Sequence, residues 1–308
     1  MFILYGNEKT EPSIRYLTGF TAPDDVAVIV DDNKTTLIVN ELEYGRAIEQ
    51  SHDCEVHCPT SLLGKRGYIC DCIGEYAARH NHKEAFCAHS FPYGLVIELE
   101  ENYDLTIFVS NTSWLEKRRM VKTDDEIAKI AGVQKVTHKA MEAAGELIAS
   151  ATPNEAGVLV LSDGTILTSE LVRHKIRMVC IENDCIDEST IVAGGIQGVN
   201  PHEEGHGPLH ANEWIVIDIF PRSLTNGYWG DMTRTFMNGT PSEAQQRQYD
   251  IVQRAHDEAI EKVRHGVNAA DIHNGVNALF EENGFYTTYG EDHAEGFFRR
   301  IGRLIDPV

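Results

Sequence analysis

The amino-acid sequence predicts an α/β (α+β) protein of two domains. Three observations indicate this class: short β-branched runs alternate with turns over about the first 115 residues, a long run with helical spacing follows, and further strand-like and helical segments lie beyond it. The basic cluster Lys117-Arg118-Arg119 precedes the body of the long helix and marks the expected boundary. The predicted domains are residues 1–120 and 121–308, each long enough for its own core.

The first domain is expected to hold strands connected by tight turns. The runs are rich in β-branched residues and are bounded by Asp, Asn and Gly: VAVIV (26–30), TTLIV (35–39) and GLVIEL (94–99). Asp-Asn between the first two runs predicts a hairpin. AIEQ (47–50) and GEYAARHNH (74–82) favour helices. No catalytic pattern is evident in this half of the chain.

The second domain is expected to begin with one long helix over 115–150. Thr123 and Glu126 form a capping-box pattern inside it, and apolar residues then recur at helical spacing. Further elements follow in order: a helix at 165–178, a strand in STIVAGG (189–195), a loop at 199–212, a hairpin at 215–236, a helix after Pro241 and a helix at 271–282.

Net charge and hydropathy disfavour several classes of partner, although the main interpretation of the acidic charge is that it promotes solubility. The formal charge is −21, and nucleic acids and anionic membranes both select clustered Lys and Arg. The first residues, MFILYGNEKTE, contain an apolar run that is too short for a signal peptide, and the residues after it are too acidic. No segment approaches the roughly 18–20 apolar residues of a membrane helix. A cytoplasmic protein without nucleic-acid or membrane partners is expected.

The seven cysteines are an odd number without an export signal, which fits reduced thiols. A zinc site is the alternative, built from the close spacings Cys54/Cys58 and Cys70/Cys72 with His52 and His57 nearby. These spacings lack the paired CxxC pattern of structural zinc sites, so the thiol interpretation is preferred.

The apolar stretch IVIDIFPRSLTNGYWGDMTRTF (215–236) carries two aspartates, Asp218 and Asp231. If the turn runs from Arg222 to Gly227, the two carboxylates lie opposite each other on facing strands. Like charges there destabilise the ladder, and an apolar setting increases the cost. A shared proton, a basic partner or a cation would relieve it. In the structural alternative one Asp caps a turn and the other pairs with Arg222 or Arg234; in the metal alternative the pair binds divalent ions.

The same stretch resembles a known signature. Asp218, Gly227-Tyr228, Asp231 and Thr233-Arg234-Thr235 are similar to the D…GY..D.TRT pattern of the M24 metallopeptidases, which have the pita-bread fold. IRYLTGFTAPDDVAVIV (14–30) resembles the creatinase-like N-terminal domain of the aminopeptidase P and Xaa-Pro dipeptidase branch, and GGIQGVNPHEEGHGPL (194–209) resembles the segment before the hairpin. The resemblance implies a creatinase-like domain followed by a pita-bread catalytic domain.

The resemblance also implies roles for particular residues. Asp218 would bind one of two divalent metals and Asp231 would bridge both, with manganese favoured over cobalt or zinc. His202 would position the substrate, with His206 and His210 as alternatives. The implied reaction removes the N-terminal residue from short peptides of the Xaa-Pro type, and a homodimer is expected.

The resemblance breaks down near the C-terminus. The family's remaining ligands, a His and two Glu, follow a segment like Gly296-Phe297-Phe298, but here no His follows His293 and no Glu follows Glu295. We therefore expect a truncated catalytic domain, through a shifted reading frame after Phe298 or as a short homologue. Uncovered sheet edges predict low solubility or self-association. The alternatives are a non-catalytic pita-bread module that binds a peptide or partner, and a creatinase-like amidinohydrolase, which the Asp pair disfavours.

Overall fold

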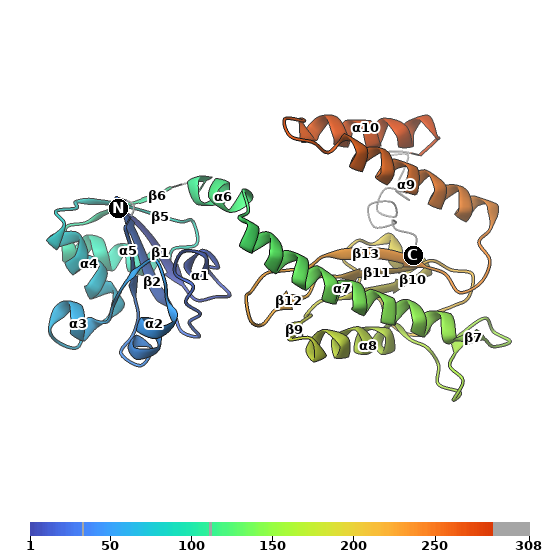
Figure 1. Cartoon of the computed structure of the whole chain (residues 1–308), viewed down its shortest axis with the longest axis horizontal. Helices are drawn as coiled ribbons and strands as arrows, with labels where there is room; N and C mark the ends of the chain where they lie inside the picture. Colours follow the sequence, from blue (N-terminus) through green and yellow to red (C-terminus); the bar gives the residue numbers. More distant parts are fainter. Residues whose placement is uncertain (33, 111–112, 286–308) are drawn as a thin grey trace. The chain divides into compact units, whose positions relative to one another are not determined.

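The fold was obtained as a computed structural model that describes residues 1–32, 34–110 and 113–285 (Figure 1). The chain divides into two compact units, Met1–Lys122 and Thr123–Val308. Each unit has its own sheet and core, and each is described separately below. Within the described residues, no helix combines the length and the apolar character that crossing a bilayer requires.

The first unit is built on a mixed sheet in the order β4-β3-β2-β1-β5-β6. The strands are β1 (Phe2–Gly6), β2 (Val26–Asp31), β3 (Lys34–Ile38), β4 (Glu55–His57), β5 (Glu84–Cys87) and β6 (Thr106–Val109). The helices are α1 (Ser13–Thr18), α2 (Tyr44–Gln50), α3 (Pro59–Leu63), α4 (Ile69–Arg79), α5 (Tyr93–Tyr103) and α6 (Ser113–Met120). Strand β2 is antiparallel to both of its neighbours, whereas β3–β4, β1–β5 and β5–β6 are parallel pairs.

The predicted hairpin of β2 and β3 is present, with Val28 opposite Leu37 and Asp31 opposite Lys34. Both faces of the sheet are covered. Ile3 and Ile29 belong to one apolar cluster and Leu4 and Val28 to another, as the period-2 alternation of a strand requires. Burial on both faces explains why these runs are continuously apolar rather than alternating.

The strand predicted at residues 94–99 is wrong, because GLVIEL lies inside helix α5. Pro92 precedes the helix in the extended region of φ/ψ space, and Leu95 and Leu99 then fall four residues apart on the buried side. Leu99 has no exposed surface. A short apolar run fits either a strand or a buried helical turn, and here the packing against the sheet selects the helix.

The second unit places helices on both faces of an antiparallel sheet in the order β10-β11-β13. Its strands are β7 (Thr152–Pro153), β8 (Leu159–Val160), β9 (Cys185–Ile186), β10 (Ile191–Gly194), β11 (Ile215–Ile219), β12 (Arg222–Ser223) and β13 (Met232–Phe236). Its helices are α7 (Asp124–Ser150), α8 (Ser169–Glu182), the 3₁₀ turn η1 (Gly195–Val199), α9 (Glu243–Lys262) and α10 (Ala269–Glu282).

The long helix expected over 115–150 is two helices, α6 and α7, separated at 121–123. Thr123 has extended backbone angles, and its side chain accepts a hydrogen bond from the Glu126 backbone N–H. The Glu126 carboxylate accepts one in return from the Thr123 N–H, so the predicted capping box is confirmed. The box stops the helix from continuing backwards into the basic cluster, which therefore lies at the end of α6.

Strand β11 sends alternate side chains to the two faces of its sheet. Ile215, Ile217 and Ile219 join the core that includes α7 and α8, whereas Val216 packs with residues of α9 and α10 on the other face (Figure 1). Because side chains alternate along a strand, Asp218 shares the face of Val216. The face opposite α7 and α8 is therefore the one that carries the aspartate.

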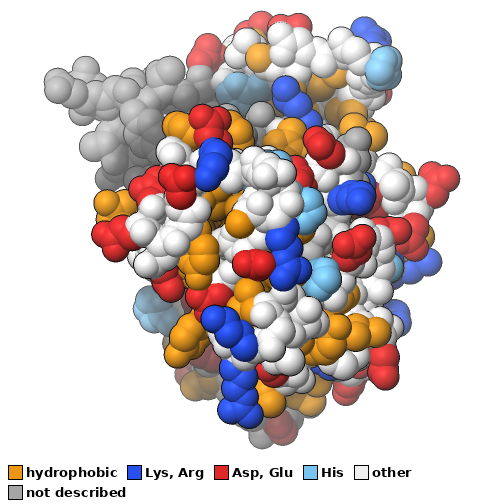
Figure 2. Space-filling model, turned by 90° about the vertical axis from the view of Figure 1, so that its left-hand side faces the viewer, with side chains coloured by type: hydrophobic (Ala, Val, Ile, Leu, Met, Phe, Trp, Pro, Cys, Tyr) orange, Lys and Arg blue, Asp and Glu red, His pale blue; other side chains and the backbone are white. Residues whose placement is uncertain are grey.

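The acidic composition is visible at the surface. On the face shown in Figure 2, Lys and Arg side chains are scattered among carboxylates, histidines and uncharged groups. That face has no continuous basic stripe of the kind that binds nucleic acid. All seven cysteines are free thiols, and the described residues contain no group of three His, Cys, Asp or Glu side chains that could hold a metal ion. The zinc alternative therefore finds no support in the described part of the first unit.

Candidate metal centre

Asp218 lies in the central strand of the sheet, opposite Ile191 on β10 and Thr233 on β13. Pairing on both sides fixes its backbone, and the apolar side chains on either side of it, Ile217 and Ile219, are anchored in the core. Its Oδ1 accepts a hydrogen bond from the Thr233 hydroxyl at 2.7 Å. The TRT part of the signature therefore has a direct role, because its first Thr orients the Asp218 carboxylate.

Asp231 precedes β13, and its backbone is held by helix α7. The Gln134 side-chain amide donates from Nε2 to the Asp231 carbonyl oxygen at 2.9 Å. The Gln134 Oε1 accepts from the Asp231 N–H at 3.1 Å. Gly230 permits this close approach, because a Cβ at that position would lie 2.2 Å from Thr137 Oγ1 on the same helix. Both backbone groups of Asp231, its N–H and its carbonyl, are thus hydrogen-bonded to a side chain of α7.

The expected direct opposition of Asp218 and Asp231 is wrong. Asp218 pairs with Thr233, and extending the register back beyond the start of β13 places Asp231, two residues before Thr233, opposite Phe220. The connection is longer than a tight turn because Arg222 and Ser223 form strand β12, which pairs with β9. A shift of two residues preserves the face, so both carboxylates still lie on the same side of the sheet as diagonal neighbours.

The two carboxylates interact electrostatically. Asp231 is exposed at the residue level, yet partial burial of its carboxyl raises its pKa, and the negative charge of Asp218 raises that pKa further. Both effects disfavour the ionised form. A divalent cation bound between the two groups would remove the repulsion. The repulsion expected from the sequence therefore contributes to a measurable quantity, the raised pKa of Asp231.

A third carboxyl group, Asp187, was not recognised from the sequence. Its side chain is 6% exposed, and it accepts a hydrogen bond from the Thr190 hydroxyl through Oδ2. Its Oδ1 has no hydrogen-bond partner among the described residues. Burial raises the pKa of Asp187, the largest effect, and Asp218 is among the charges that raise it. In the sequence, the only signal for Asp187 is that an acidic residue lies just before a buried strand. Its proximity to Asp218 depends on the register of the sheet.

His202 lies after η1, in a loop that is clamped to the rest of the unit. Arg173, a buried residue of α8, donates to the backbone carbonyls of Glu204 and Gly205. The Gln197 side chain bonds both the N–H and the carbonyl of His206, at 2.9 and 3.0 Å. The clamp holds the loop immediately after His202, whereas the imidazole of His202 is exposed.

The alternative histidines have other surroundings. His206 is exposed and lies with its Nδ1 3.5 Å from Glu203 Oε1. His210 pairs through its backbone with Val158 in an isolated bridge. Among the described residues, no hydrogen bond or ion pair connects His202, His206 or His210 with Asp218 or Asp231. His293, Glu295 and the segment after Phe298 lie outside the described residues.

The donor set fits a hard divalent cation. Two carboxylates share one face, burial and the charge of Asp218 raise the pKa of Asp231, and the buried Asp187 Oδ1 has no hydrogen-bond partner among the described residues. Carboxylate oxygens are suited to manganese or magnesium rather than to soft metals. The described residues supply these two ligands and no third one gathered around the same point. A cavity of about 760 Å³ lies elsewhere, in the first unit.

The chain is similar to known proteins over both of its units. Residues 128–306 match metallopeptidase family M24, and residues 2–121 match the creatinase/prolidase N-terminal domain. The chain is 25% identical over 288 residues to an Xaa-Pro dipeptidase of Pyrococcus horikoshii, covering 92% of this chain and 75% of that relative. An Xaa-Pro dipeptidase of Pyrococcus furiosus is also 25% identical, over 287 residues and with the same coverage.

Solved structures show the same fold. The prolidase from Pyrococcus horikoshii superimposes with a TM-score of 0.75 at 23% identity, covering 92% of this chain and 74% of that one. An Xaa-Pro dipeptidase from Bacillus anthracis gives a TM-score of 0.78 at 18% identity, covering 94% of this chain and 75% of that one. The architecture is thus a creatinase-like N-terminal domain followed by a pita-bread domain. With the family match spanning more than half of the sequence, this chain belongs to metallopeptidase family M24.

Proposed function

We propose that this chain is a metal-dependent exopeptidase that removes the N-terminal residue from short peptides, with Xaa-Pro peptides as its substrate class. The single observation that carries the proposal is the pair Asp218 and Asp231, two carboxylates on one sheet face, where burial and then the charge of Asp218 raise the pKa of Asp231. The similarity to Xaa-Pro dipeptidases supports the substrate class.

In this proposal Asp218 and Asp231 hold the metal ions and His202 contacts the peptide. Bound divalent ions would supply charge stabilisation and activate water for attack on a peptide carbonyl. The Thr233 hydroxyl fixes the orientation of the Asp218 carboxylate, and Gln134 fixes the backbone of Asp231. We place manganese first, because a carboxylate set selects hard ions.

A second function is favoured by a separate observation. The described residues contain no third ligand gathered with the two aspartates, and an incomplete coordination sphere binds metal weakly. This favours a non-catalytic pita-bread module that binds peptides or a protein partner through the same face. The creatinase-like amidinohydrolase alternative is disfavoured by the peptidase relatives.

The two functions are separated by metal retention and turnover measured on the same sample. The full chain is incubated with manganese, desalted, assayed for metal by atomic absorption, and then tested with an Xaa-Pro dipeptide and an Xaa-Pro tripeptide. The exopeptidase proposal predicts retained manganese and turnover, both lost in Asp218→Asn and Asp231→Asn. Asp250→Asn, an exposed aspartate on α9, is the matched control.

Metal retained by the wild type but not by the two site variants, without turnover on either peptide, supports binding without catalysis. No manganese retained and no turnover would exclude the exopeptidase function for this polypeptide. A homodimer is proposed as the assembly, and size-exclusion chromatography with light scattering on the same sample tests it. A single monomeric species with a cooperative melt would contradict both the dimer and the predicted self-association.

A further inference from the structure

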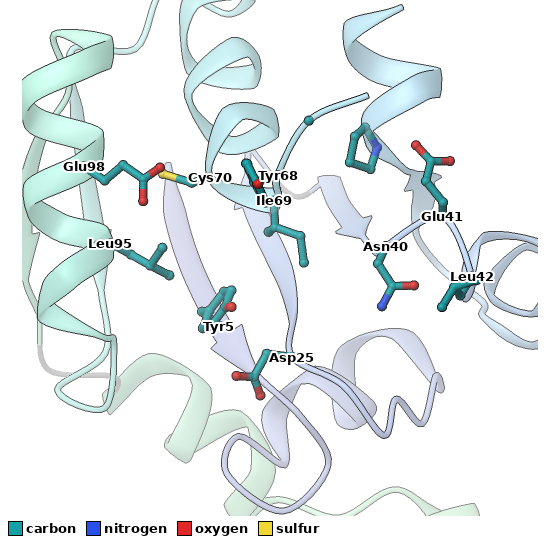
Figure 3. A pocket seen from close by; sticks show the side chains of 12 residues that line it. Tyr5, Asp25, Asn40, Glu41, Leu42, Tyr68, Ile69, Cys70, Leu95 and Glu98 are labelled. Atoms are coloured by element: carbon teal, nitrogen blue, oxygen red, sulfur yellow. The ribbon is translucent and has the colours of Figure 1, made fainter. Parts of the chain in front are cut away.

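A cavity of about 760 Å³ lies in the first unit, well apart in sequence from the aspartate pair (Figure 3). This volume falls in the range of small-molecule pockets, roughly 300–1,000 Å³. Tyr5 of β1, Asn40 after β3 and Pro59 after β4 all line it. Strands β1, β3 and β4 run in the same direction, so their carboxyl ends meet at this edge of the sheet. Ligand sites of open α/β sheets form at such carboxyl ends.

One side of the cavity is apolar. The Tyr5 ring, Leu95 of α5 and Ile69 at the start of α4 line it (Figure 3). The Tyr5 ring is held by an edge contact with Phe91, with ring centroids 6.2 Å apart. The Tyr5 hydroxyl makes no hydrogen bond to any described residue, and burial raises its pKa, with the charge of Asp25 as the next cause. The Tyr5 hydroxyl is therefore a polar group, at the end of the apolar side of the cavity, that has no hydrogen-bond partner among the described residues.

Two carboxylates flank this apolar side. Figure 3 shows Glu98 beside Cys70 at one end and Asp25 below Tyr5 at the other, with Leu95 between them. Among the described residues neither Asp25 nor Glu98 forms an ion pair, and the twelve lining residues contain no Lys, Arg or His. The cavity therefore presents negative charge without a compensating cation of its own.

A third carboxylate that lines the cavity, Glu41, has a structural role in the fold. Its Oε1 accepts hydrogen bonds from the Thr60 N–H at 2.8 Å and from the Thr60 hydroxyl at 2.6 Å, which caps α3. Asp25 and Glu98 are engaged less fully. Asp25 Oδ1 accepts from Asn7 Nδ2 at 2.8 Å, and Glu98 lies against the Cys70 thiol, whose pKa burial raises to about 12, with the Glu98 charge contributing. Asp25 and Glu98 therefore keep more hydrogen-bonding capacity for a ligand than Glu41 does.

We propose that this cavity binds an aliphatic diamine. One ammonium group would lie at Asp25 and the other at Glu98, with the methylene chain on Leu95, Ile69 and the Tyr5 ring. An ammonium–carboxylate contact is a charge-assisted hydrogen bond, and the aromatic ring adds attraction for a cation. Anions are excluded by the same two carboxylates. This site is independent of the aspartate pair and of the peptidase proposal.

The test is calorimetric titration of the full chain at low ionic strength, where screening is weak. The probe is 1,5-diaminopentane, and the comparison ligands are pentylamine, which has one ammonium, and 1-pentanol, which has none. The proposal predicts that the diamine binds about tenfold more tightly than pentylamine, as one added charge contact provides. 1-Pentanol binding as tightly as the diamine, or no diamine binding, overturns it.

The variants Asp25→Asn and Glu98→Gln are each expected to weaken diamine binding about tenfold and to leave pentanol unaffected. Glu101→Gln is the matched control, because Glu101 is an exposed carboxylate on the same helix as Glu98 but does not line the cavity. Asp25 is exposed, so its variant retains the fold even if Glu98→Gln disturbs the Cys70 contact. Equal weakening by the control would refute the assignment.

A lysine side chain from a protein offers the same ammonium chemistry as a free amine. Nα-acetyl-lysine amide distinguishes the two sources, because it carries a single ammonium on a four-carbon chain. The diamine is expected to bind about tenfold more tightly than this compound. Equal affinity would refute simultaneous contact with Asp25 and Glu98.

Discussion

Replacing Gly205 by alanine is the most direct perturbation of the clamped loop that follows His202. Gly205 has φ +79°, and a Cβ there would lie 1.8 Å from the Val192 carbonyl oxygen. The oxygen belongs to the backbone of β10, so it has no rotamer through which to move away. The loop must instead separate from the strand, which breaks the hydrogen bond from the Val192 N–H to the Glu204 carbonyl, now 2.9 Å.

The magnitude follows from the contacts that are lost. The left-handed conformation costs an alanine about 1 kcal/mol, the backbone hydrogen bond is worth about 1 kcal/mol, and the charged Arg173 contact to the displaced carbonyls about 2 kcal/mol. The expected destabilisation is therefore about 4 kcal/mol. For a unit of this size that corresponds to a fall in Tm of about 10 °C.

Gly207→Ala is the matched control. Gly207 also has a left-handed φ, +73°, but a Cβ there meets nothing within 4 Å. It should show the conformational cost alone, about 1 kcal/mol or roughly 3 °C. Differential scanning calorimetry measures both variants, and hydrogen exchange at residues 200–207 locates the change. Equal shifts in Tm for the two variants would show that Gly205 is not packed against β10 as described.

The remaining predictions concern the aspartate pair and the buried thiols. Because the folded-state pKa of Asp231 is raised, its ionisation reduces stability as pH rises above the unfolded value of about 3.9, so Asp231→Asn should raise the Tm of the metal-free protein at pH 7. That gain should vanish below about pH 3.9, and a pH-independent gain would contradict the raised pKa of Asp231. Gln134→Ala should cost about 1 kcal/mol and speed hydrogen exchange at the Asp231 amide, whereas unchanged exchange would show that the side chain does not hold it. The Cys180 pKa is raised to about 12 by burial, so at pH 8 only about one thiol in ten thousand is ionised, and iodoacetamide should label it far more slowly than in the unfolded chain. Labelling at the unfolded rate, read by mass spectrometry, would contradict that burial.

Local pattern was sufficient for much of the second unit. The capping box of Thr123 and Glu126 was recognisable from the sequence, because its hydrogen bonds connect residues only three apart, but the helix was expected to begin earlier, at residue 115. Helices α9 and α10 lie where helices were predicted after Pro241 and at 271–282, and in the structure they are capped by Ser242 and Asn268. The first unit was harder, since strands buried on both faces and helix α5 have similar apolar composition.

The sequence by itself determined that Asp218 and Asp231 lie on one face, because the side-chain period of a strand is two and an even shift in register preserves the face. Only the tertiary structure decided the register. Strand β12 lengthens the connection by pairing with β9, and no local signal in the turn residues encodes a partner some forty residues away. The contacts that hold the site have the same origin: Gln134 reaches Asp231 across 97 residues, and Asp187 meets the charge of Asp218 only through the pairing of β10 with β11. Local spacing determines the face on which a side chain lies, whereas packing between distant segments determines which residues it contacts.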